Sequence, residues 1–122
     1  MIGGAGGIGS ACAKALAEAG AKVAVVDLSA EAADVVAATF NGCGYAIDAG
    51  DEASIQDLHG KIESTLGAVD ILVNSAVVFQ AAEPATRLSM SHWDKVVRVS
   101  QRATFLACAV FGGGLPSAPS GN

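Results

Sequence analysis

The feature with the clearest chemistry is a cluster of five glycines in the N-terminal stretch IGGAGGIGS. Glycine lets the main chain approach a ligand closely, and N–H groups at a helix start carry partial positive charge, so such a loop suits a pyrophosphate. Two registers fit the glycines. Gly4, Gly6 and Gly9 match G-x-G-x-x-G, the general dinucleotide pattern, whereas Gly3, Gly7 and Gly9 match the more specialised G-x-x-x-G-x-G. A P-loop is excluded because no Gly-Lys-Ser/Thr follows.

A carboxylate stands at the distance from this loop at which a nucleotide site needs one. Asp27 ends the run AKVAVVD, about twenty residues after the glycines, where it can bind the ribose hydroxyls of adenosine. Its charge would repel the extra phosphate of NADP, and no Arg or Lys lies between Gly3 and Ser10 to compensate. We therefore expect NAD in preference to NADP. The alternative interpretation of Asp27 is an ordinary turn residue at a strand end.

The composition and charge of the chain limit the kinds of function it can have. The chain has 122 residues, 52% hydrophobic and 16% charged, which suits one compact domain. The net charge of -5 comes without a basic stripe, so nucleic-acid binding is not expected. The apolar run 107–111 is too short to span a bilayer, and the start lacks a basic segment followed by an apolar one. We expect a cytoplasmic protein without a membrane span.

The residues that could bind metal are scattered. The three cysteines, Cys12, Cys43 and Cys108, are widely spaced among apolar residues, which predicts buried or half-buried free thiols. His59 and His92 have no partner at ligand spacing. We therefore expect no metal site.

The elements that must position the loop and Asp27 follow from periodicity. Apolar spacing and turn residues predict helices and strands in alternation: helix 10–19, strand 21–27, helix 30–40, strand 45–48, helix 52–66, strand 69–74 and helix 92–111. Ser29, Asp51 and Ser91 are the expected helix caps. This order predicts an α/β fold with a parallel sheet. Residues 1–111 would form the domain, and 112–122 a disordered tail.

Three stretches carry a family resemblance. Residues 2–9 align with T-G-x-x-x-G-x-G, with Ile2 in place of Thr; residues 70–77, DILVNSAV, are similar to D-I-L-V-N-N-A-G; and WDKVVRVSQRATF is similar to W-D-x-V-x-x-V-N-L-x-G-T-F. On these motifs the chain resembles NAD-dependent short-chain dehydrogenases/reductases, which favours the second glycine register. The resemblance implies a Rossmann-like, doubly wound parallel sheet.

The resemblance also implies a set of site residues. Asp48 falls where the family contacts the adenine amino group, Asn74 where it holds the central sheet, and Ala76 beside the cofactor. Ser100 stands at the position of the catalytic Asn. The full set expected around the dinucleotide is Gly3, Gly7, Ile8, Gly9, Asp27, Leu28, Asp48, Ala49, Asn74 and Ala76.

The family's catalytic residues find no match. Its members move a hydride between the nicotinamide and an alcohol or carbonyl carbon, with proton transfer by a Tyr in Y-x-x-x-K and an upstream Ser. Tyr45 is the one tyrosine, and Ala49 stands where the Lys would follow. Only two residues precede Gly3, so the first strand, like the C-terminal strands, is expected to be missing, leaving unpaired edges and exposed apolar faces.

Two function classes follow. The first is the cofactor-binding portion of a dehydrogenase, truncated at both ends and active on an alcohol or carbonyl substrate only with the missing segments. The second is a non-catalytic nucleotide-binding or subunit-interaction module. In the family the equivalent of helix 92–111 commonly packs against another subunit, and Lys95, Arg98 and Arg102 are expected to face solvent or such a partner.

Overall fold

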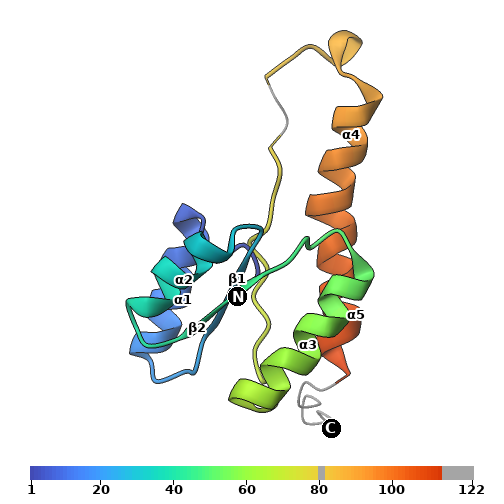
Figure 1. Cartoon of the computed structure of the whole chain (residues 1–122). Helices are drawn as coiled ribbons and strands as arrows, with labels where there is room; N and C mark the ends of the chain where they lie inside the picture. Colours follow the sequence, from blue (N-terminus) through green and yellow to red (C-terminus); the bar gives the residue numbers. More distant parts are fainter. Residues whose placement is uncertain (80–81, 114–122) are drawn as a thin grey trace, which may run out of the picture.

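A computed structural model describes residues 1–79 and 82–113. Helices and strands alternate through the first half, and one long helical segment follows (Figure 1). The elements are α1 (Gly7–Glu18), β1 (Ala24–Asp27), α2 (Ala30–Ala38), β2 (Cys43–Ala46), α3 (Glu52–Leu66), the short 3-10 helix η1 (Ala85–Arg87), α4 (Met90–Val96), the π-helical η2 (Val97–Arg102) and α5 (Ala103–Gly112). The predicted α/β class is confirmed.

The sheet is small and parallel. β1 pairs with β2 in the register Ala24↔Cys43 to Asp27↔Ala46. On its other side, β1 meets the N-terminal residues, which were expected to leave the first-strand position empty. Ile2 instead forms parallel bridges to both Val26 and Asn74. The first two residues, which we call the N-terminal stub, therefore lie between β1 and Asn74.

The predicted strand 69–74 is wrong as a regular strand. Only Asn74 forms a bridge, and its partner is Ile2. The Ile2 N–H donates to the Val73 carbonyl (2.9 Å) and the Ser75 N–H to the Ile2 carbonyl (2.8 Å). Strand structure requires a paired neighbour along its length, and the stub supplies one at a single position. The apolar run alone could not show this.

Helices cover both faces of the sheet (Figure 1). Side chains of successive strand residues point to opposite faces, so β1 feeds two separate cores. Val23 and Val25 pack in a cluster with Ala13 of α1 and with Ala33 and Ala37 of α2. Ala24 and Val26 pack in the other, whose remaining members are Ile2, Ile55, Leu58, Ile62, Leu106, Ala107 and Phe111. This is the doubly wound, Rossmann-like arrangement that the sequence predicts.

Two of the three predicted N-caps, Ser29 and Asp51, are confirmed. The Ser29 hydroxyl accepts from the Ala32 N–H (3.2 Å), the Asp51 carboxylate accepts from the Ser54 N–H (3.0 Å), and Gly67 closes α3. The cap predicted at Ser91 is wrong. Ser89 accepts from the His92 N–H (3.2 Å), so α4 begins two residues earlier.

The long helix predicted over 92–111 is continuous from α4 through α5, and its α4 end extends away from the sheet and the other helices (Figure 1). Its middle, η2, is a π-helical turn that periodicity did not predict. Gly112, expected in the tail, is the last helical residue, and 114–122 lie outside the described residues. The Cys108 thiol, expected to be at least half-buried, is exposed on α5.

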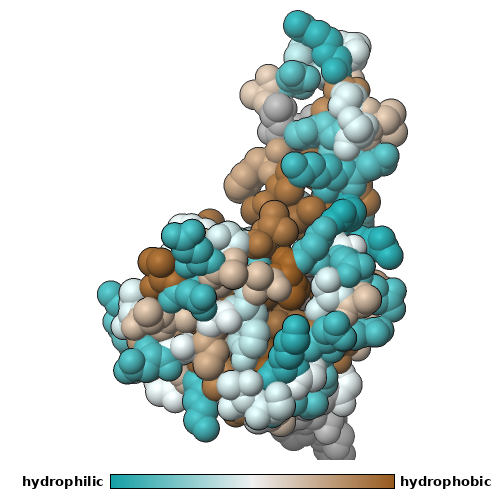
Figure 2. All heavy atoms as spheres, viewed as in Figure 1, coloured by the Kyte–Doolittle hydropathy of each residue, from teal (hydrophilic) through white to brown (hydrophobic). Residues whose placement is uncertain are grey.

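Apolar surface is concentrated between the α1–α2 side of the molecule and the α3–α5 side. Figure 2 shows it as a band down the middle of this face, with polar surface on both outer sides. The exposed large apolar residues include Ile8, Leu28, Ile71 and Phe79. The exposed apolar surface expected from an incomplete sheet is therefore present.

Candidate functional site

The glycine loop is confined by close backbone contacts at two of its glycines. Gly3 has φ +73°, and a Cβ there would lie 2.5 Å from the Ala76 nitrogen. A Cβ on Gly9 would lie 2.0 Å from the Gly3 oxygen. Of the two glycines that only the general register requires, Gly6 would make an ordinary 3.6 Å contact, whereas a Cβ on Gly4 would lie 2.8 Å from the Val25 side chain. The crowding at Gly3 fits the second register, but the crowding at Gly4 fits the general one, so these contacts alone do not choose between them.

Gly7 differs from these because it faces open space. A Cβ on Gly7 would meet nothing within 4 Å, and the residue lines a cleft of about 1000 Å³. It is also the first residue of α1, whose N-cap, Gly6, has no side chain to accept from the first-turn N–H groups. The end of the helix therefore presents N–H donors and a positive dipole end at the cleft, which suits an anion.

Asp27 is held against this loop. One carboxylate oxygen accepts from the Ala5 N–H (2.9 Å) and the other from the Leu28 N–H (2.8 Å). Each carboxylate oxygen keeps a further lone pair, so the group can still accept from a ligand hydroxyl. The glycine loop and Asp27 thus form one unit, although β1 and α1 separate them in sequence.

Asp48 lies on the same cleft and is paired with Arg98 across 50 positions of sequence. Its other oxygen accepts from the Gly50 N–H (2.9 Å). The Gly50 hydrogen bond first, and then the Arg98 guanidinium, hold the pKa of the Asp48 carboxyl below its ordinary value. Arg98 was expected to face solvent or a partner subunit. No local sequence signal links it to Asp48.

This ion pair predicts a pH dependence of stability. The folded-state pKa of Asp48 is depressed, so its stabilisation is complete above the unfolded-state value of about 3.9 and is lost as the pH falls through the lower folded-state value. Asp48→Asn should therefore unfold at lower urea concentration than the parent chain at neutral pH, and the two midpoints should converge in acid. Midpoints that stay equally far apart down to acid pH would show that ionisation of Asp48 does not matter.

A second group of polar contacts lies behind the cleft. Asn74 donates to the Thr104 hydroxyl (2.6 Å) and accepts from the Ala76 N–H (3.1 Å), which ties residues 74–76 to α5. The Ser100 hydroxyl accepts from the Val78 N–H (3.1 Å). Ser100 lies in the π-helical turn, and its side chain is engaged with the main chain rather than directed at the cleft.

The cleft brings together most of the predicted site. Nine of the ten residues expected around a dinucleotide line it, and Asn74 stands behind it instead. Ser100 does not line it, whereas its neighbour Val99 does. Sequence reasoning missed two cations of the lining, Lys95 and Arg98. Helical spacing placed them on one face of a helix, but it could not show that the face borders the cleft.

Residues 1–79 and 82–113 contain no group of three or more His, Cys, Asp or Glu side chains placed to hold a metal ion. Within them, no helix combines the length and the apolar character needed to cross a membrane.

Comparison with known proteins decides the family. The family model described as short chain dehydrogenase matches residues 1–122. The chain belongs to the short-chain dehydrogenase family. That assignment confirms the resemblance seen in the glycine loop and in the two later motifs, and it makes the chain a member of an oxidoreductase family that uses a nicotinamide cofactor.

Named relatives are consistent with the family. D-threitol dehydrogenase of Mycolicibacterium smegmatis is 42% identical, over 92% of this chain and 45% of its own length. Sorbitol dehydrogenase of Cereibacter sphaeroides is 35% identical, over 85% and 41%. The crystal structure of a short-chain dehydrogenase described as a glucose/ribitol dehydrogenase, from Brucella melitensis, matches with a TM-score of 0.88 and 26% identity, over 94% and 50%. The chain thus spans half or less of the length of each.

Proposed function

We propose that this chain is the NAD-binding portion of a short-chain dehydrogenase. The observation that carries the proposal is the convergence of the open α1 N-terminus at Gly7 and the Asp27 carboxylate on one cleft. The N–H groups of the helix start would bind the diphosphate, and Asp27 would accept from the adenosine ribose hydroxyls. Asp48 and Ala49 would border the adenine. Bound there, the nicotinamide would supply hydride-transfer chemistry.

NAD rather than NADP follows from charge. With the adenosine ribose bound at Asp27, as proposed, a 2′-phosphate would lie beside this carboxylate, and like charges repel. Of the two cations that line the cleft, Lys95 and Arg98, the second is already paired with Asp48. We therefore propose a preference for NAD.

The substrate class is proposed from the relatives. Those named above act on D-threitol, sorbitol and glucose or ribitol, so we propose that the whole protein oxidises a polyol hydroxyl to a carbonyl or carries out the reverse reduction. The described residues bind and orient the cofactor in this account. Tyr45 is half-buried in β2 with Ala49 four residues on, and the Ser100 hydroxyl is engaged by Val78. We propose that the chain by itself does not complete the proton transfer.

A Gly7→Ala substitution tests the binding. The new methyl meets no protein atom within 4 Å, so the fold should be retained. It stands where the diphosphate must approach the main chain, so NADH affinity should fall about tenfold, as expected for roughly 1.4 kcal/mol of lost interaction. NADH fluorescence titration gives the affinity, and circular dichroism checks the fold. Unchanged affinity in a folded variant would contradict diphosphate binding at this loop.

The second candidate is a non-catalytic nucleotide-binding or subunit-interaction module. It is favoured by the Tyr45 environment and by α5, where Phe105 is 71% exposed and Cys108 is also exposed. A longer product of the same gene that binds NADH but does not reduce NAD with a polyol would favour it, and polyol turnover by that product would exclude it. We also propose a cytoplasmic location, where an exposed thiol such as Cys108 stays reduced.

A further inference from the structure

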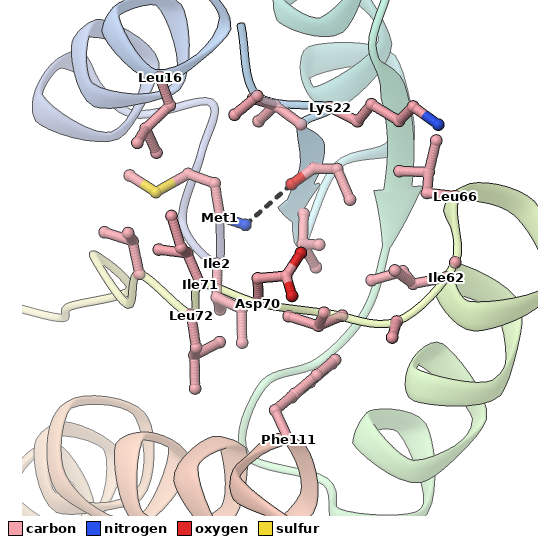
Figure 3. Close-up of a pocket in the computed structure, with 18 of the residues that line it drawn as sticks. Met1, Ile2, Leu16, Lys22, Ile62, Leu66, Asp70, Ile71, Leu72 and Phe111 are labelled. Atoms are coloured by element: carbon pink, nitrogen blue, oxygen red, sulfur yellow. Dashed lines mark hydrogen bonds between the residues drawn. The ribbon is translucent and has the colours of Figure 1, made fainter. Parts of the chain in front are cut away.

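The charged side chains of the glycine cleft distinguish it from a second cavity of about 400 Å³ beside Met1, which is lined mainly by apolar side chains (Figure 3). Two carboxylates, Asp27 and Asp48, and two cations, Lys95 and Arg98, line the cleft. The proposed binding of NAD gives roles to the carboxylates and none to the cations. Arg98 is the cation whose contacts define a role.

The Asp48 carboxylate is held by donors from two separate elements. Arg98 lies in η2, and its guanidinium donates to Oδ2 of Asp48. The Gly50 N–H donates to Oδ1 (2.9 Å). The last side-chain torsion of an aspartate is broad when nothing restrains it. One donor would leave the carboxylate free to turn, whereas the two donors together fix its plane.

Gly50 makes room for Arg98 because it has no side chain. A Cβ on Gly50 would lie 2.5 Å from Nε of Arg98, 2.9 Å from its Cγ and 3.0 Å from its Cζ. Gly50 is buried and its φ is not in the left-handed region. The close approach of Arg98, and not an unusual backbone conformation, therefore accounts for a glycine at this position. The same residue thus seats the guanidinium and holds the carboxylate.

The pair of side chains is accessible to a ligand. The Arg98 and Asp48 side chains are 43% and 44% exposed, and both line the cleft. The pKa of the Asp48 carboxyl is lowered by the Gly50 hydrogen bond and then by Arg98, so the group is ionised and can only accept hydrogen bonds. Each oxygen uses one lone pair on a protein donor and keeps another for a ligand.

A group that only accepts selects a ligand group that donates. Adenine carries an amino donor on its six-membered ring, whereas hypoxanthine carries a carbonyl oxygen at the same position, which a carboxylate repels. Hydrogen bonds weaken steeply as their geometry departs from linearity. The selection between the two bases therefore depends on the direction in which the Asp48 lone pairs point, and on the residue that sets this direction.

We propose that Arg98, seated on Gly50, is a positioning residue that orients the Asp48 carboxylate toward the amino group of an adenine base. The cleft thereby selects adenine over a purine with a carbonyl oxygen in that position. The proposal rests on the proposed binding of a dinucleotide in this cleft. Arg98 acts through Asp48 and does not itself contact the base.

The test compares NADH with reduced nicotinamide hypoxanthine dinucleotide, which differs from NADH only in its purine, by fluorescence titration of the 122-residue chain. The parent chain should bind NADH about tenfold more tightly, as expected for one hydrogen bond to a charged group. Arg98→Met keeps an unbranched stem and should lower this ratio of affinities about threefold to fivefold, as expected for a weakened hydrogen bond. In an Asp48→Ala chain the ratio should be close to one, and adding Arg98→Met should not change it further.

Arg102→Met is the matched control. Arg102 lies in the same π-helical turn as Arg98 but does not line the cleft, so both affinities should stay as in the parent chain. Circular dichroism checks that each variant is folded. Where Arg98→Met does not fold, Arg98→Lys takes its place. Its ratio should also lie below that of the parent chain, because an ammonium lacks the planar fork of the guanidinium.

The ratio of affinities separates positioning of Asp48 from other roles of Arg98. A loosened fold, or a direct contact of Arg98 with the diphosphate, would lower both affinities alike and leave the ratio unchanged. An unchanged ratio in a folded Arg98 variant, with NADH still bound by the parent chain, would overturn this proposal and leave the proposed function standing. Absence of NADH binding by the folded parent chain would overturn both.

Discussion

Gly9→Ala is expected to destabilise the fold by about 3 kcal/mol, at the upper end of the usual cost of overpacking. The new Cβ would lie 2.0 Å from the Gly3 oxygen and 2.9 Å from the Gly3 carbonyl carbon. Both are backbone atoms of the loop, so no side-chain rotation can relieve the overlap. The loop or the start of α1 must move, and the cleft must deform with it. Urea unfolding followed by circular dichroism measures the change.

Gly60→Ala is the matched control. Gly60 is an exposed residue inside α3, and a Cβ there meets nothing within 4 Å. Alanine is the better helix former, so this variant should be more stable by about 0.5–1 kcal/mol. If Gly9→Ala were as stable as the parent chain, the close packing of the loop against the start of α1 would be wrong.

Asp27→Ala is expected to weaken NADH binding by about tenfold to a hundredfold, because a hydrogen bond to a charged group contributes roughly 1.5–3 kcal/mol. NADPH binding should weaken less or improve, since the substitution removes the charge that opposes the 2′-phosphate. The ratio of the two affinities is therefore the decisive quantity. Parallel fluorescence titrations with NADH and NADPH measure it.

Two comparisons keep this result interpretable. Asp27 also accepts from the Ala5 and Leu28 N–H groups, so Asp27→Asn, which keeps an acceptor, separates loss of charge from loss of the loop contact. Asp57→Ala removes an exposed carboxylate of α3 that does not line the cleft and should leave both affinities unchanged. An unchanged NADH to NADPH ratio in Asp27→Ala would remove Asp27 from ribose recognition.

The parts of the fold that were predictable depend on local chemistry. Ser29 and Asp51 bond to an N–H three residues on, so their caps can be derived from a few neighbouring residues. The local rule chose Ser91 over Ser89 wrongly, because both are serines near the start of the same helix and either side chain can cap it. The prediction of a strand over 69–74 was wrong for a different reason. Whether these residues form a strand depends on a hydrogen-bonding partner elsewhere in the chain, and an apolar run does not show whether that partner exists.

In the candidate site, too, the features that depend on nearby residues were predictable and those that depend on distant partners were not. The glycine loop and Asp27 could be found from spacing because one βαβ-type unit contains both. The Asp48–Arg98 pair could not, since 50 residues separate the partners and only the packing of the long helix brings them together. Asn74 was placed beside the dinucleotide by resemblance, yet its contacts are to Thr104 and Ala76, so its role here is to position the lining.

The central claim is that a dinucleotide binds between the glycine loop, Asp27 and Asp48. The most direct measurement is an amide-resolved NMR titration of the folded chain with NADH. We expect saturable shifts at Gly7, Ile8 and Gly9, at Leu28 and at Ala49, with little change at residues 66–72, which do not line the cleft. Saturable shifts confined to other surfaces, or no shifts from a folded chain, would contradict it.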